Sequence, residues 1–517
     1  MNTEMSTDLP AVVFGAGRLT LDDVIHLALR RRRAELNPAQ PFRDRIERGA
    51  AFLDRLLAED GVVYGVTTGY GDSCTVDVPP ELIAELPHHL YTYHGIGCGP
   101  MLGEQETRAV LAARLCSLTQ GVSGVSVGLL AQLTAFLTHD VLPRIPSEGS
   151  VGASGDLTPL SYVAATLCGE REVNFGGQLR PASEVLAEIG LRPLRLRPKE
   201  ALALMNGTSM MTGLACLAWW RAARVARLAT RITACNVWAA DGNAHHFDEV
   251  LFACKPHPGP QLVARRIRDD LESDRPVRNE QRLQDRYSLR CAPHVIGVLE
   301  DCLTWTRKVI EDELNSANDN PLIDPDGERV LHGGHFYGGH IAMAMDCLKT
   351  AVASVADLLD RQLALLVDPK FNHGLPANLS GATGTRSAVN HGLKALQISV
   401  SAWTAEALKQ TMPATAFSRS TECHNQDKVS MGAIAARDAL RVLTLTEQVV
   451  AGMLISSRQA ITLRQRVSER HPPSSLAGYQ DLLAIRIPLV EEDRALDNDL
   501  HSILAALSAD ELEAYDL

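Results

Sequence analysis

The sequence has no excess of basic residues. Its 50 lysines and arginines are outnumbered by 62 aspartates and glutamates, which gives a formal net charge of −12. A chain without a broad basic surface has little attraction for nucleic acid or anionic lipid, so binding to either is not expected. With 517 residues, 45% of them hydrophobic, the chain is long and apolar enough for a globular protein of more than one domain. Chemistry on a small molecule is therefore the favoured class of function.

Cysteine pairs at metal-ligand spacing are also missing. The eleven cysteines stand at positions 74, 98, 116, 168, 216, 235, 254, 291, 302, 347 and 423. No two form a CxxC pair, and most lie in apolar helical contexts such as "VAATLCGE", which is typical of reduced, buried thiols in a cytoplasmic protein. The first thirty residues show no export signal, and no uninterrupted apolar run reaches about eighteen residues. We therefore expect a cytoplasmic location and no membrane span.

Strand signals are few, and the sequence shows no internal repeat. The N-terminal part alternates short helical patterns with turns rich in glycine and proline, including a predicted hairpin in "REVNFGGQLRPASE". Farther along, apolar residues recur at three- and four-residue spacing over 213–240, 294–317, 341–367 and 432–463. These stretches predict long helices in an extended antiparallel bundle rather than a coiled coil, because heptads are not sustained. We expect a mainly α fold, with a loop-rich N-terminal domain at 1–205 and a helical bundle with C-terminal helices at 206–517.

Four small residues in a row, Gly152 to Gly155, precede an acidic residue in "VGASGDLTPLS". One interpretation is a tight turn into a helix, in which Ser154 or Asp156 accepts from the first free amides. A hydrolase nucleophile elbow is excluded, because its Gly-x-Ser-x-Gly pattern needs glycine where Asp156 stands. A third interpretation uses all the small residues. In a compressed turn the Gly155 nitrogen closes a five-membered ring on the Ala153 carbonyl carbon, and Ser154 loses water to leave an exocyclic methylene.

Together with "YGVTTGYG", "ALMNGTS", "RYSLR" and "NSANDNP", the motif "GASGDLTPLS" resembles the aromatic amino acid ammonia-lyase family, which includes histidine, phenylalanine and tyrosine ammonia-lyases and related aminomutases. The resemblance implies that Ala153, Ser154 and Gly155 form a 4-methylidene-imidazol-5-one group (MIO) without any metal. It implies an enzyme that removes ammonia from an α-amino acid to give an α,β-unsaturated acid. It also implies a homotetramer in which long central helices pack together and each active site is built from three chains.

The resemblance implies roles for residues outside this turn. Tyr64 in "YGVTTGYG" matches the family's catalytic base, and a phenol needs a nearby positive field, such as helix N-termini, to act as a base at neutral pH. Gln284, Tyr287 and Arg290 match family site positions and are spaced three apart on one face of a predicted helix. In this arrangement the Arg290 guanidinium is the clamp for the substrate carboxylate, because it presents two parallel donors.

Two further positions border the ring in the family. Asn206 in "MNGTS" matches the asparagine that contacts the ring group and the substrate carboxylate, and Phe336 matches the phenylalanine packed beside the ring. The stretch "HGGHFYGGH" departs from the usual Asn-Phe-His-Gly by carrying His335 and Tyr337, so no role is carried over to these two residues. Neither the histidines of this stretch nor "HHFDE" forms a complete ligand set at a recognised spacing, so no metal site is expected.

The residues that should meet the substrate side chain match no usual subgroup. The selectivity pair falls on Tyr93 and His94, where histidine lyases typically have Ser-His, tyrosine lyases His-Leu and phenylalanine lyases Phe-Leu. His94 favours histidine, but Gln426 stands where histidine lyases carry glutamate and where phenylalanine and tyrosine lyases carry glutamine. The site is polar enough for a phenol and lacks the anion expected for an imidazole. The predicted order is tyrosine, which gives 4-coumarate, then phenylalanine, which gives cinnamate, then histidine, which gives urocanate.

Two other functions stay open on the sequence alone. A 2,3-aminomutase would use the same residues but return the captured amine to the β-carbon. A helical scaffold that descends from a lyase and has no activity is the alternative outside enzymes. The joint presence of Tyr64, Asn206, Tyr287 and Arg290 argues against that scaffold.

Overall fold

The structure is a computed structural model that describes residues 9–59, 61–272, 283–512 and 514–515. Helices predominate and the strands are short, which confirms the predicted mainly α fold. The chain divides into two compact units. Unit 1 comprises Met1–Ala218, Arg307–Asp346 and Pro413–Arg437, and unit 2 comprises Trp219–Thr306, Cys347–Met412 and Asp438–Leu517. The boundary predicted after residue 205 lies inside the first segment of unit 1.

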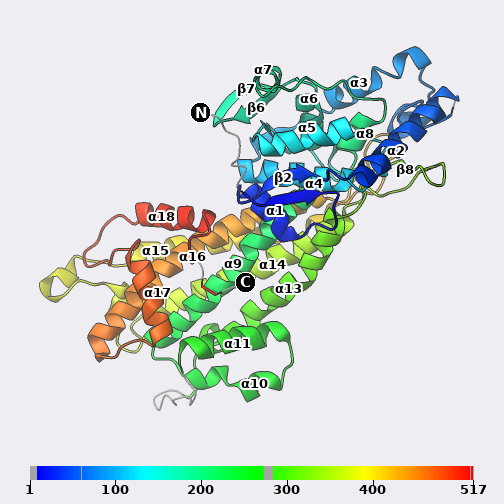
Figure 1. The fold of residues 1–517 in the computed structure, drawn as a ribbon. Coiled ribbons are helices and arrows are strands. Elements are labelled where there is room, and N and C mark those ends of the chain that lie inside the picture. Colours follow the sequence, from blue (N-terminus) through cyan, green and yellow to red (C-terminus); the bar gives the residue numbers. More distant parts are fainter. Residues whose placement is uncertain (1–8, 60, 273–282, 513, 516–517) are drawn as a thin grey trace. The chain divides into compact units, whose positions relative to one another are not determined.

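Unit 1 combines short helices with small sheets of two or three strands (Figure 1). Its elements are β1 (Ala11–Phe14), α1 (Leu21–Ala28), β2 (Arg33–Leu36), α2 (Gln40–Ala58), α3 (Leu86–Tyr93), β3 (Cys98–Met101), α4 (Glu104–Leu118), α5 (Val127–Thr138), β4 (Leu142–Pro143), β5 (Pro146–Glu148), α6 (Leu157–Leu167), β6 (Glu172–Phe175), β7 (Gln178–Pro181), α7 (Ala182–Glu188), α8 (Glu200–Met205), β8 (Leu322–Asp324) and β9 (Arg329–Leu331). The hairpin predicted in "REVNFGGQLRPASE" is confirmed as β6 and β7, which pair antiparallel. Its two turn residues, Gly176 and Gly177, both have positive φ, as a tight two-residue hairpin requires.

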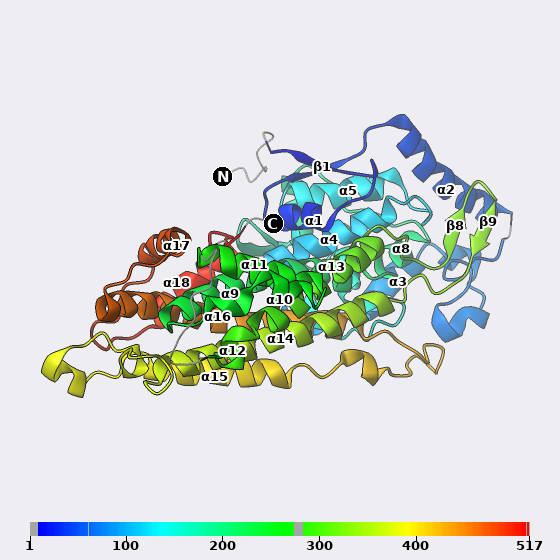
Figure 2. The same ribbon diagram turned by 90° about the horizontal axis from the view of Figure 1, so that it is seen from below.

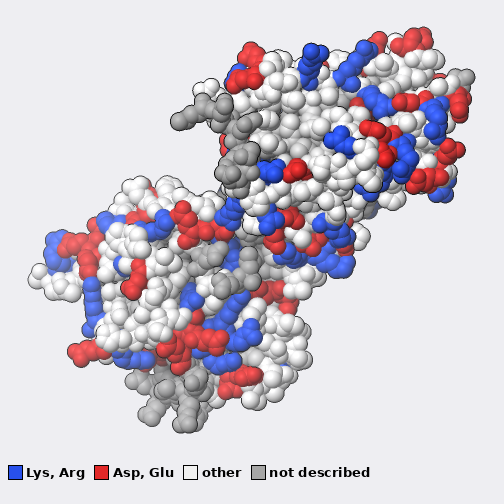
Figure 3. Space-filling model, viewed as in Figure 1, with Lys and Arg blue, Asp and Glu red and all other residues white. Residues whose placement is uncertain are grey.

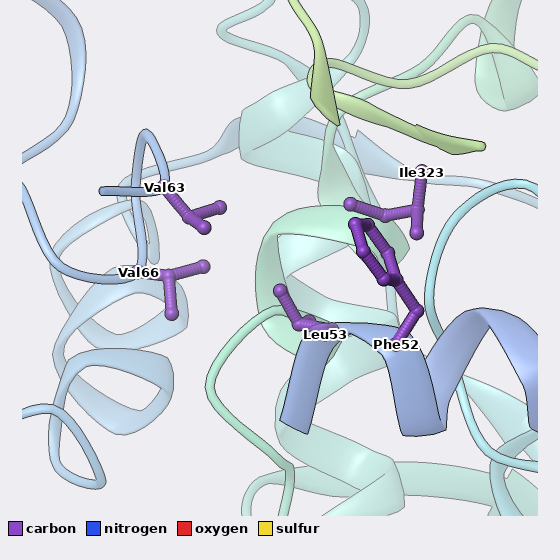
Figure 4. Close-up of a cluster of buried hydrophobic side chains, with 5 residues drawn as sticks. All are labelled: Phe52, Leu53, Val63, Val66 and Ile323. Carbon is purple, nitrogen blue, oxygen red and sulfur yellow. The ribbon is translucent and has the colours of Figure 1, made fainter. Parts of the chain in front are cut away.

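A small hydrophobic cluster in unit 1 anchors the loop that carries Tyr64 (Figure 4). Phe52 and Leu53 reach it from α2, and Ile323 reaches it from β8, which lies beside α2 in Figure 2. Val63 and Val66 are fully buried in the same cluster. The loop is irregular, but these two valines fix it to regular elements, since burying each apolar side chain contributes about 1.5–3 kcal/mol. Tyr64 lies between them in sequence and is therefore held by its neighbours.

The four long helices predicted from the sequence are all present. They are α9 (Ser209–Ala239), α13 (Ala292–Leu314), α14 (Gly339–Val367) and α16 (Gly432–Ser468), and each contributes residues to both units. Unit 2 contains most of their length together with α10 (Glu249–Ala253), α11 (Pro258–Asp270), α12 (Tyr287–Arg290), α15 (Lys394–Lys409), α17 (Ser474–Ala484) and α18 (Asp497–Ser508). Buried alanines and leucines at three- and four-residue spacing line these helices, which is the pattern that predicted them.

Hydrogen bonds fix the direction of the helices in the bundle. Thr208, just before α9, bonds to Glu313 near the end of α13, and Trp219 on α9 bonds to the carbonyl of Leu303, so these two helices run antiparallel as expected. Along α9 and α16, Arg221 pairs with Glu447, whereas Asn236, farther along α9, accepts a hydrogen bond from Ser457. These two helices therefore run in the same direction. Long segments connect the helices, so the chain can return to the same end of the bundle before the next long helix begins.

Helix α16 is, among the described helices, the one long and apolar enough to cross a bilayer. Within its most apolar window, however, 83% of the residues are buried inside the protein. Such burial is typical of a core helix. On the face shown in Figure 3, lysines and arginines are interspersed with aspartates and glutamates. That mixture agrees with the absence of a basic excess in the sequence.

Candidate active site

Unit 1 contains a cavity of about 750 Å³, a size suited to a small organic ligand. Eight of the residues predicted for the site line it together: Tyr64, Tyr93, His94, Ala153, Ser154, Asn206, Phe336 and Gln426. They come from segments separated by up to several hundred residues. The structure therefore brings together most of the site that the motifs predicted.

The turn at Ala153, Ser154 and Gly155 has an unusual backbone. Ser154 has a φ of 50° and Gly155 a φ of 75°, both in the left-handed region, which is costly for serine. A Cβ on Gly155 would overlap the carbonyl of Gly207, and the Asp156 amide donates to that same carbonyl at 2.8 Å. The turn is thus compressed against a neighbouring segment that leaves no room for a side chain. These features fit the ring group that the sequence predicts at this position.

Asp156 does not act as the helix cap that one interpretation of the sequence suggested. It stands before α6 without a capping hydrogen bond to that helix. Its carboxylate instead accepts from the Met211 amide near the start of α9 at 2.9 Å and from the Ser150 hydroxyl at 3.2 Å. The helix N-terminus attracts the carboxylate across the unit because its first amides have no partner within the helix. Asp156 therefore ties the turn to α9 rather than starting α6.

The Tyr64 hydroxyl is the candidate base. It accepts a hydrogen bond from the Gly71 amide at 2.7 Å, and the His332 ring lies edge-on to the Tyr64 ring. Burial raises the pKa of Tyr64, the Gly71 amide opposes that shift, and the Glu422 carboxylate adds to it. These neighbours therefore do not supply the predicted positive field. They provide one backbone donor, the Gly71 amide, and one carboxylate, that of Glu422. Within unit 1, the phenol is a weaker acid than free tyrosine.

Tyr93 and His94, the selectivity pair, lie at the end of α3 with their ring centroids 4.3 Å apart. The Nδ1 atom of His94 is 2.9 Å from the carbonyl oxygen of Leu90. A carbonyl only accepts, so this contact requires a proton on Nδ1. Burial lowers the pKa of His94, which favours the neutral ring. In the neutral ring, Nε2 is then an acceptor.

Gln426 is oriented by hydrogen bonds at both ends of its amide. Its Oε1 accepts from the Thr421 hydroxyl at 3.0 Å, and its Nε2 donates to the Ser154 hydroxyl at 3.1 Å. Thr421 and Gln426 also pair through their backbones, which closes a tight loop. A neutral donor thus faces the turn at Ser154.

Asn206 is 2% exposed and donates from Nδ2 to the carbonyl of Asn320 at 2.8 Å. Its Oδ1 is buried and has no hydrogen-bond partner among the described residues. An unpaired buried acceptor costs about 1–3 kcal/mol, which a donor group on a ligand in the cavity would offset. Phe336 lines the same cavity and adds an apolar surface.

Comparison with known proteins agrees with this geometry. The family model described as aromatic amino acid lyase matches residues 19–482. The chain belongs to the aromatic amino acid lyase family. A histidine ammonia-lyase of Gloeobacter violaceus is 36% identical over 493 residues, covering 95% of this chain and 94% of the relative. A tyrosine 2,3-aminomutase of Chondromyces crocatus is also 36% identical and covers 96% of each chain. The crystal structure of a tyrosine aminomutase from Streptomyces globisporus superposes with a TM-score of 0.88 at 33% identity and covers 97% of each chain. The protein is thus an enzyme of the ammonia-lyase class.

Three predicted site residues of this lyase, Gln284, Tyr287 and Arg290, belong to unit 2 and are not among those that line the cavity. The prediction that they share one helical face is wrong, because α12 begins only at Tyr287 and Gln284 precedes it. The Arg290 Nε donates to the carbonyl of Asp285 at 2.9 Å, and its guanidinium lies over the Tyr287 ring. The Tyr287 side chain is 72% exposed.

The α12 turn is attached to the bundle by a buried amide. Gln362 on α14 donates to the carbonyl of Ser288 at 2.9 Å and to the hydroxyl of Thr233 at 2.9 Å, and it accepts from Asn236 at 2.8 Å. Each polar atom of this side chain is therefore used. A fully satisfied buried amide of this kind fixes the backbone that carries Tyr287 and Arg290.

Sequence reasoning missed several residues that line the cavity of this lyase, notably Tyr70, Asn320 and Glu422. Tyr70 and Asn320 stand inside the quoted motifs "YGVTTGYG" and "NSANDNP", so their motifs could have signalled them. Glu422 lies four residues before Gln426, and its carboxylate accepts from the Asp72 amide at 2.9 Å. Only the fold shows that this carboxylate closes the loop that follows Tyr64.

No group of three or more histidine, cysteine, aspartate or glutamate residues arranged to hold a metal ion is found in the part of the lyase that the structure describes. His332 and His335 of "HGGHFYGGH" are exposed. His332 instead makes the edge-on contact with Tyr64.

Burial of Asp156 predicts that the stability of this lyase falls with rising pH. Burial raises the pKa of Asp156 from 3.8 to about 7. Between pH 3.8 and about pH 7 the folded state binds more protons than the unfolded state. The stabilisation that protonated Asp156 contributes is therefore fully present below the unfolded pKa of 3.8 and is lost as pH rises through the folded pKa of about 7. From about pH 5 to about pH 8, the melting midpoint of the wild type should fall by several degrees more than that of Asp156→Asn, which keeps an acceptor for Met211 but cannot ionise. Thermal unfolding of both proteins in matched buffers tests this, and parallel pH profiles would contradict it.

Proposed function

We propose that the enzyme eliminates ammonia from an L-aromatic amino acid, with tyrosine preferred over phenylalanine and histidine, to give an α,β-unsaturated acid such as 4-coumarate. The observation that carries this proposal is the arrangement of His94. Its Nδ1 proton is committed to Leu90, so Nε2 offers a lone pair. The hydroxyl of tyrosine is a donor that satisfies this lone pair. Phenylalanine has no such donor and would leave this acceptor unpaired.

Gln426 supports the same preference against histidine. Its amide is neutral and donates to Ser154, so it offers no negative charge to an imidazole that binds a proton. A tyrosine side chain carries no charge at neutral pH and needs no such partner. The polar groups of the cavity therefore suit a phenol better than an imidazolium.

We infer that the turn at Ala153, Ser154 and Gly155 matures into the MIO group. Its left-handed backbone and its contact with Gly207 support this inference. When formed, this group supplies an electrophilic methylidene carbon that activates the substrate amine as a leaving group. Tyr64 then takes the proton from the β-carbon, the electron pair of that C–H bond becomes the new double bond, and the C–N bond breaks. The unpaired Oδ1 of Asn206 accepts a hydrogen bond from the substrate's nitrogen.

The substrate carboxylate is held by Arg290, and we propose that this residue comes from another copy of the chain. Tyr287 and Arg290 sit on a short helix whose tyrosine is largely exposed, as a residue donated to another subunit would be before assembly. Large apolar side chains such as Val298 on α13 and Met343 on α14 are also exposed. Long helices with uncovered apolar residues support the homotetramer that the family resemblance implies.

We place the enzyme in the cytoplasm, where thiols stay reduced. The prediction that the cysteines are buried holds for only part of the set. Four are buried free thiols, Cys116, Cys216, Cys235 and Cys302, whereas Cys74, Cys98, Cys254 and Cys423 are exposed. Burial raises the pKa of Cys116 and of Cys235 to about 12, which keeps both unreactive. Neither a nucleic acid nor a membrane is part of this proposal.

Product analysis with the three aromatic amino acids tests the proposal. We expect 4-coumarate from tyrosine with a kcat/KM at least about a hundredfold above that for cinnamate formation, because the acceptor on His94 discriminates against a missing hydroxyl. Urocanate should be a minor product, because Gln426 offers no negative charge to an imidazolium. His94→Leu removes that acceptor and should reverse the order of tyrosine and phenylalanine. Urocanate as the main product of the wild type would overturn the proposed preference, and an unchanged order in His94→Leu would remove the role of His94.

A tyrosine 2,3-aminomutase is the second candidate, because a relative named tyrosine 2,3-aminomutase and a solved structure named tyrosine aminomutase are 36% and 33% identical to this chain. It would release β-tyrosine in place of free ammonia. The same assay separates the two functions: chromatography with mass detection resolves the β-amino acid, and an enzyme-linked ammonia assay measures elimination. For the lyase we expect one ammonia for each tyrosine consumed.

A further inference from the structure

Behind the reactive turn of unit 1 lies a buried arginine that the proposed chemistry does not use. Arg114 on α4 is 0% exposed. Its Nη2 donates to the Ser117 hydroxyl at 2.9 Å and to the carbonyl of Asn318 at 2.9 Å, and its Nη1 lies 3.4 Å from the carbonyl of Asn206. One side chain thus joins three separate segments of the unit. The planar guanidinium suits this task, because its five donors point in fixed directions.

The charge of Arg114 has no direct counterion. No carboxylate forms an ion pair with it among the residues that the structure describes. Of the nearby acids, Asp319 pairs with the buried Lys199 at 2.6 Å, and Asp156 is engaged by the Met211 amide. Burial lowers the pKa of Arg114 to about 10, so the guanidinium remains charged at neutral pH. A buried charge held only by neutral acceptors is costly, and an apolar side chain would fill the same space more cheaply.

Arg114 lies against Gly207, which in turn lies against Gly155 of the turn. A Cβ on Gly207 would overlap the Arg114 guanidinium and would lie 2.8 Å from the carbonyl oxygen of Asn318. A Cβ on Gly155 would in turn overlap the backbone of Gly207. Gly155 and Gly207 also pair as an isolated parallel bridge. Guanidinium, Gly207 and Gly155 are therefore in direct contact, with no space for a methyl group at either glycine.

We propose that Arg114 is a positioning residue for maturation of the turn: it holds Gly207 in place, and Gly207 in turn presses Gly155 toward Ala153. This inference rests on the proposed function, because the matured turn is part of it. Without the guanidinium, the Asn206–Gly207 segment can retreat into the vacated space, and the Gly155 nitrogen loses its approach to the Ala153 carbonyl carbon.

The covalent step balances without any other reactant. The Gly155 nitrogen bonds to the Ala153 carbonyl carbon, and that carbonyl oxygen leaves as water with the protons of the Gly155 and Ser154 amides. A double bond then joins the Ala153 carbon to the Ser154 nitrogen. A second water takes the Ser154 hydroxyl and its Cα proton, which leaves the methylidene. The chain therefore becomes lighter by two waters, and that loss is measurable without assaying activity.

The test compares Arg114→Met with Arg108→Met in the full-length protein. Arg108 lies on the same helix and is equally buried, and it donates to the carbonyls of Leu27 and Leu137 and pairs with Asp140. Both variants should lose thermal stability to a similar extent. Intact mass under denaturing conditions, followed over time after synthesis is stopped, gives the rate of water loss, and peptide mapping places it at 149–167. We expect Arg114→Met to mature at least about tenfold more slowly than the wild type and Arg108→Met to mature at the normal rate.

The outcomes separate the two proposals. Normal maturation of folded Arg114→Met, or equal slowing in Arg108→Met, would overturn the role of Arg114 and leave the proposed function intact. A wild-type chain without the loss of two waters would overturn the proposed function itself. If Arg114→Met does not fold, Ser117→Ala replaces it, because it removes one acceptor of the guanidinium and one acceptor of the Asn318 amide. We expect that variant to mature about threefold more slowly, as loss of about one hydrogen bond implies, and a normal rate would overturn the role of Arg114.

Discussion

Replacing Ser154 by alanine should lower lyase activity by at least about three orders of magnitude while the chain keeps its fold. Alanine has no hydroxyl to lose, so it cannot supply the methylidene carbon that activates the amine. The expected cost to folding is small, because among the residues that the structure describes the Ser154 hydroxyl has one hydrogen-bond partner, the Gln426 amide. Activity is measured by the absorbance of the unsaturated acid, and folding is measured by thermal unfolding.

The matched control for this prediction is Ser161→Ala. Ser161 is fully buried on α6, and its hydroxyl donates to the carbonyl of Thr158. The control removes a serine hydroxyl a few residues from the turn without touching the reactive residues, so it should keep near-normal activity. Intact mass should show the loss of two waters in Ser161→Ala but not in Ser154→Ala. Activity of Ser154→Ala above about a tenth of the wild-type value would contradict the assigned chemistry.

Replacing Tyr64 by phenylalanine should lower kcat/KM by about 10²–10⁴, the usual contribution of a positioned base. The same residue should set a limb of the pH profile. A phenol acts as a base only after it loses its proton, and burial together with Glu422 raises the pKa of Tyr64. In the wild type, deprotonation of Tyr64 should therefore contribute about a tenfold rise in kcat/KM per pH unit until pH exceeds the phenol's ordinary value of about 10.

Comparison of pH profiles separates Tyr64 from the substrate. The substrate amine also loses a proton at alkaline pH, but it does so identically with every variant. The limb that disappears in Tyr64→Phe is therefore the one that belongs to Tyr64. Tyr91→Phe serves as the control, because Tyr91 is buried on α3 and its hydroxyl bonds to Glu170 away from the cavity. An unchanged profile in Tyr64→Phe would assign the base to another residue.

The sequence predicted those features that depend on residues close together in the chain, such as the turn at 152–155 and the long helices. The small residues at 152–155 pointed to a compressed turn, and the structure shows left-handed backbone at Gly152, Ser154 and Gly155. The periodicity of the long helices predicted their limits to within a few residues, because one buried face over several turns gives a strong repeating signal. The signal is weak for short elements, and Gln284 was placed on a helix that begins only at Tyr287. A helix of four residues is too short to show a repeating pattern of apolar residues.

Long-range contacts account for what the sequence could not predict. Asp156 was a plausible cap for the helix that follows it, but its carboxylate binds the Met211 amide, 55 residues away. Glu422 gave no signal of its own, yet it binds the Asp72 amide and raises the pKa of Tyr64. In both residues, the partner of a charged side chain depends on how distant segments pack.

The sequence by itself determined the mainly α fold, the long helices and the residue types that can form an electrophile and a base. It did so because helical periodicity and the small size of a side chain are local properties of the chain. Only the tertiary structure decided that Arg114 contacts Gly207 beside Gly155, that His94 has Nε2 as its acceptor, and that Tyr64 has a carboxylate near it. The reason is physical: hydrogen bonding, burial and charge act through space, and their partners here come from segments far apart in the chain.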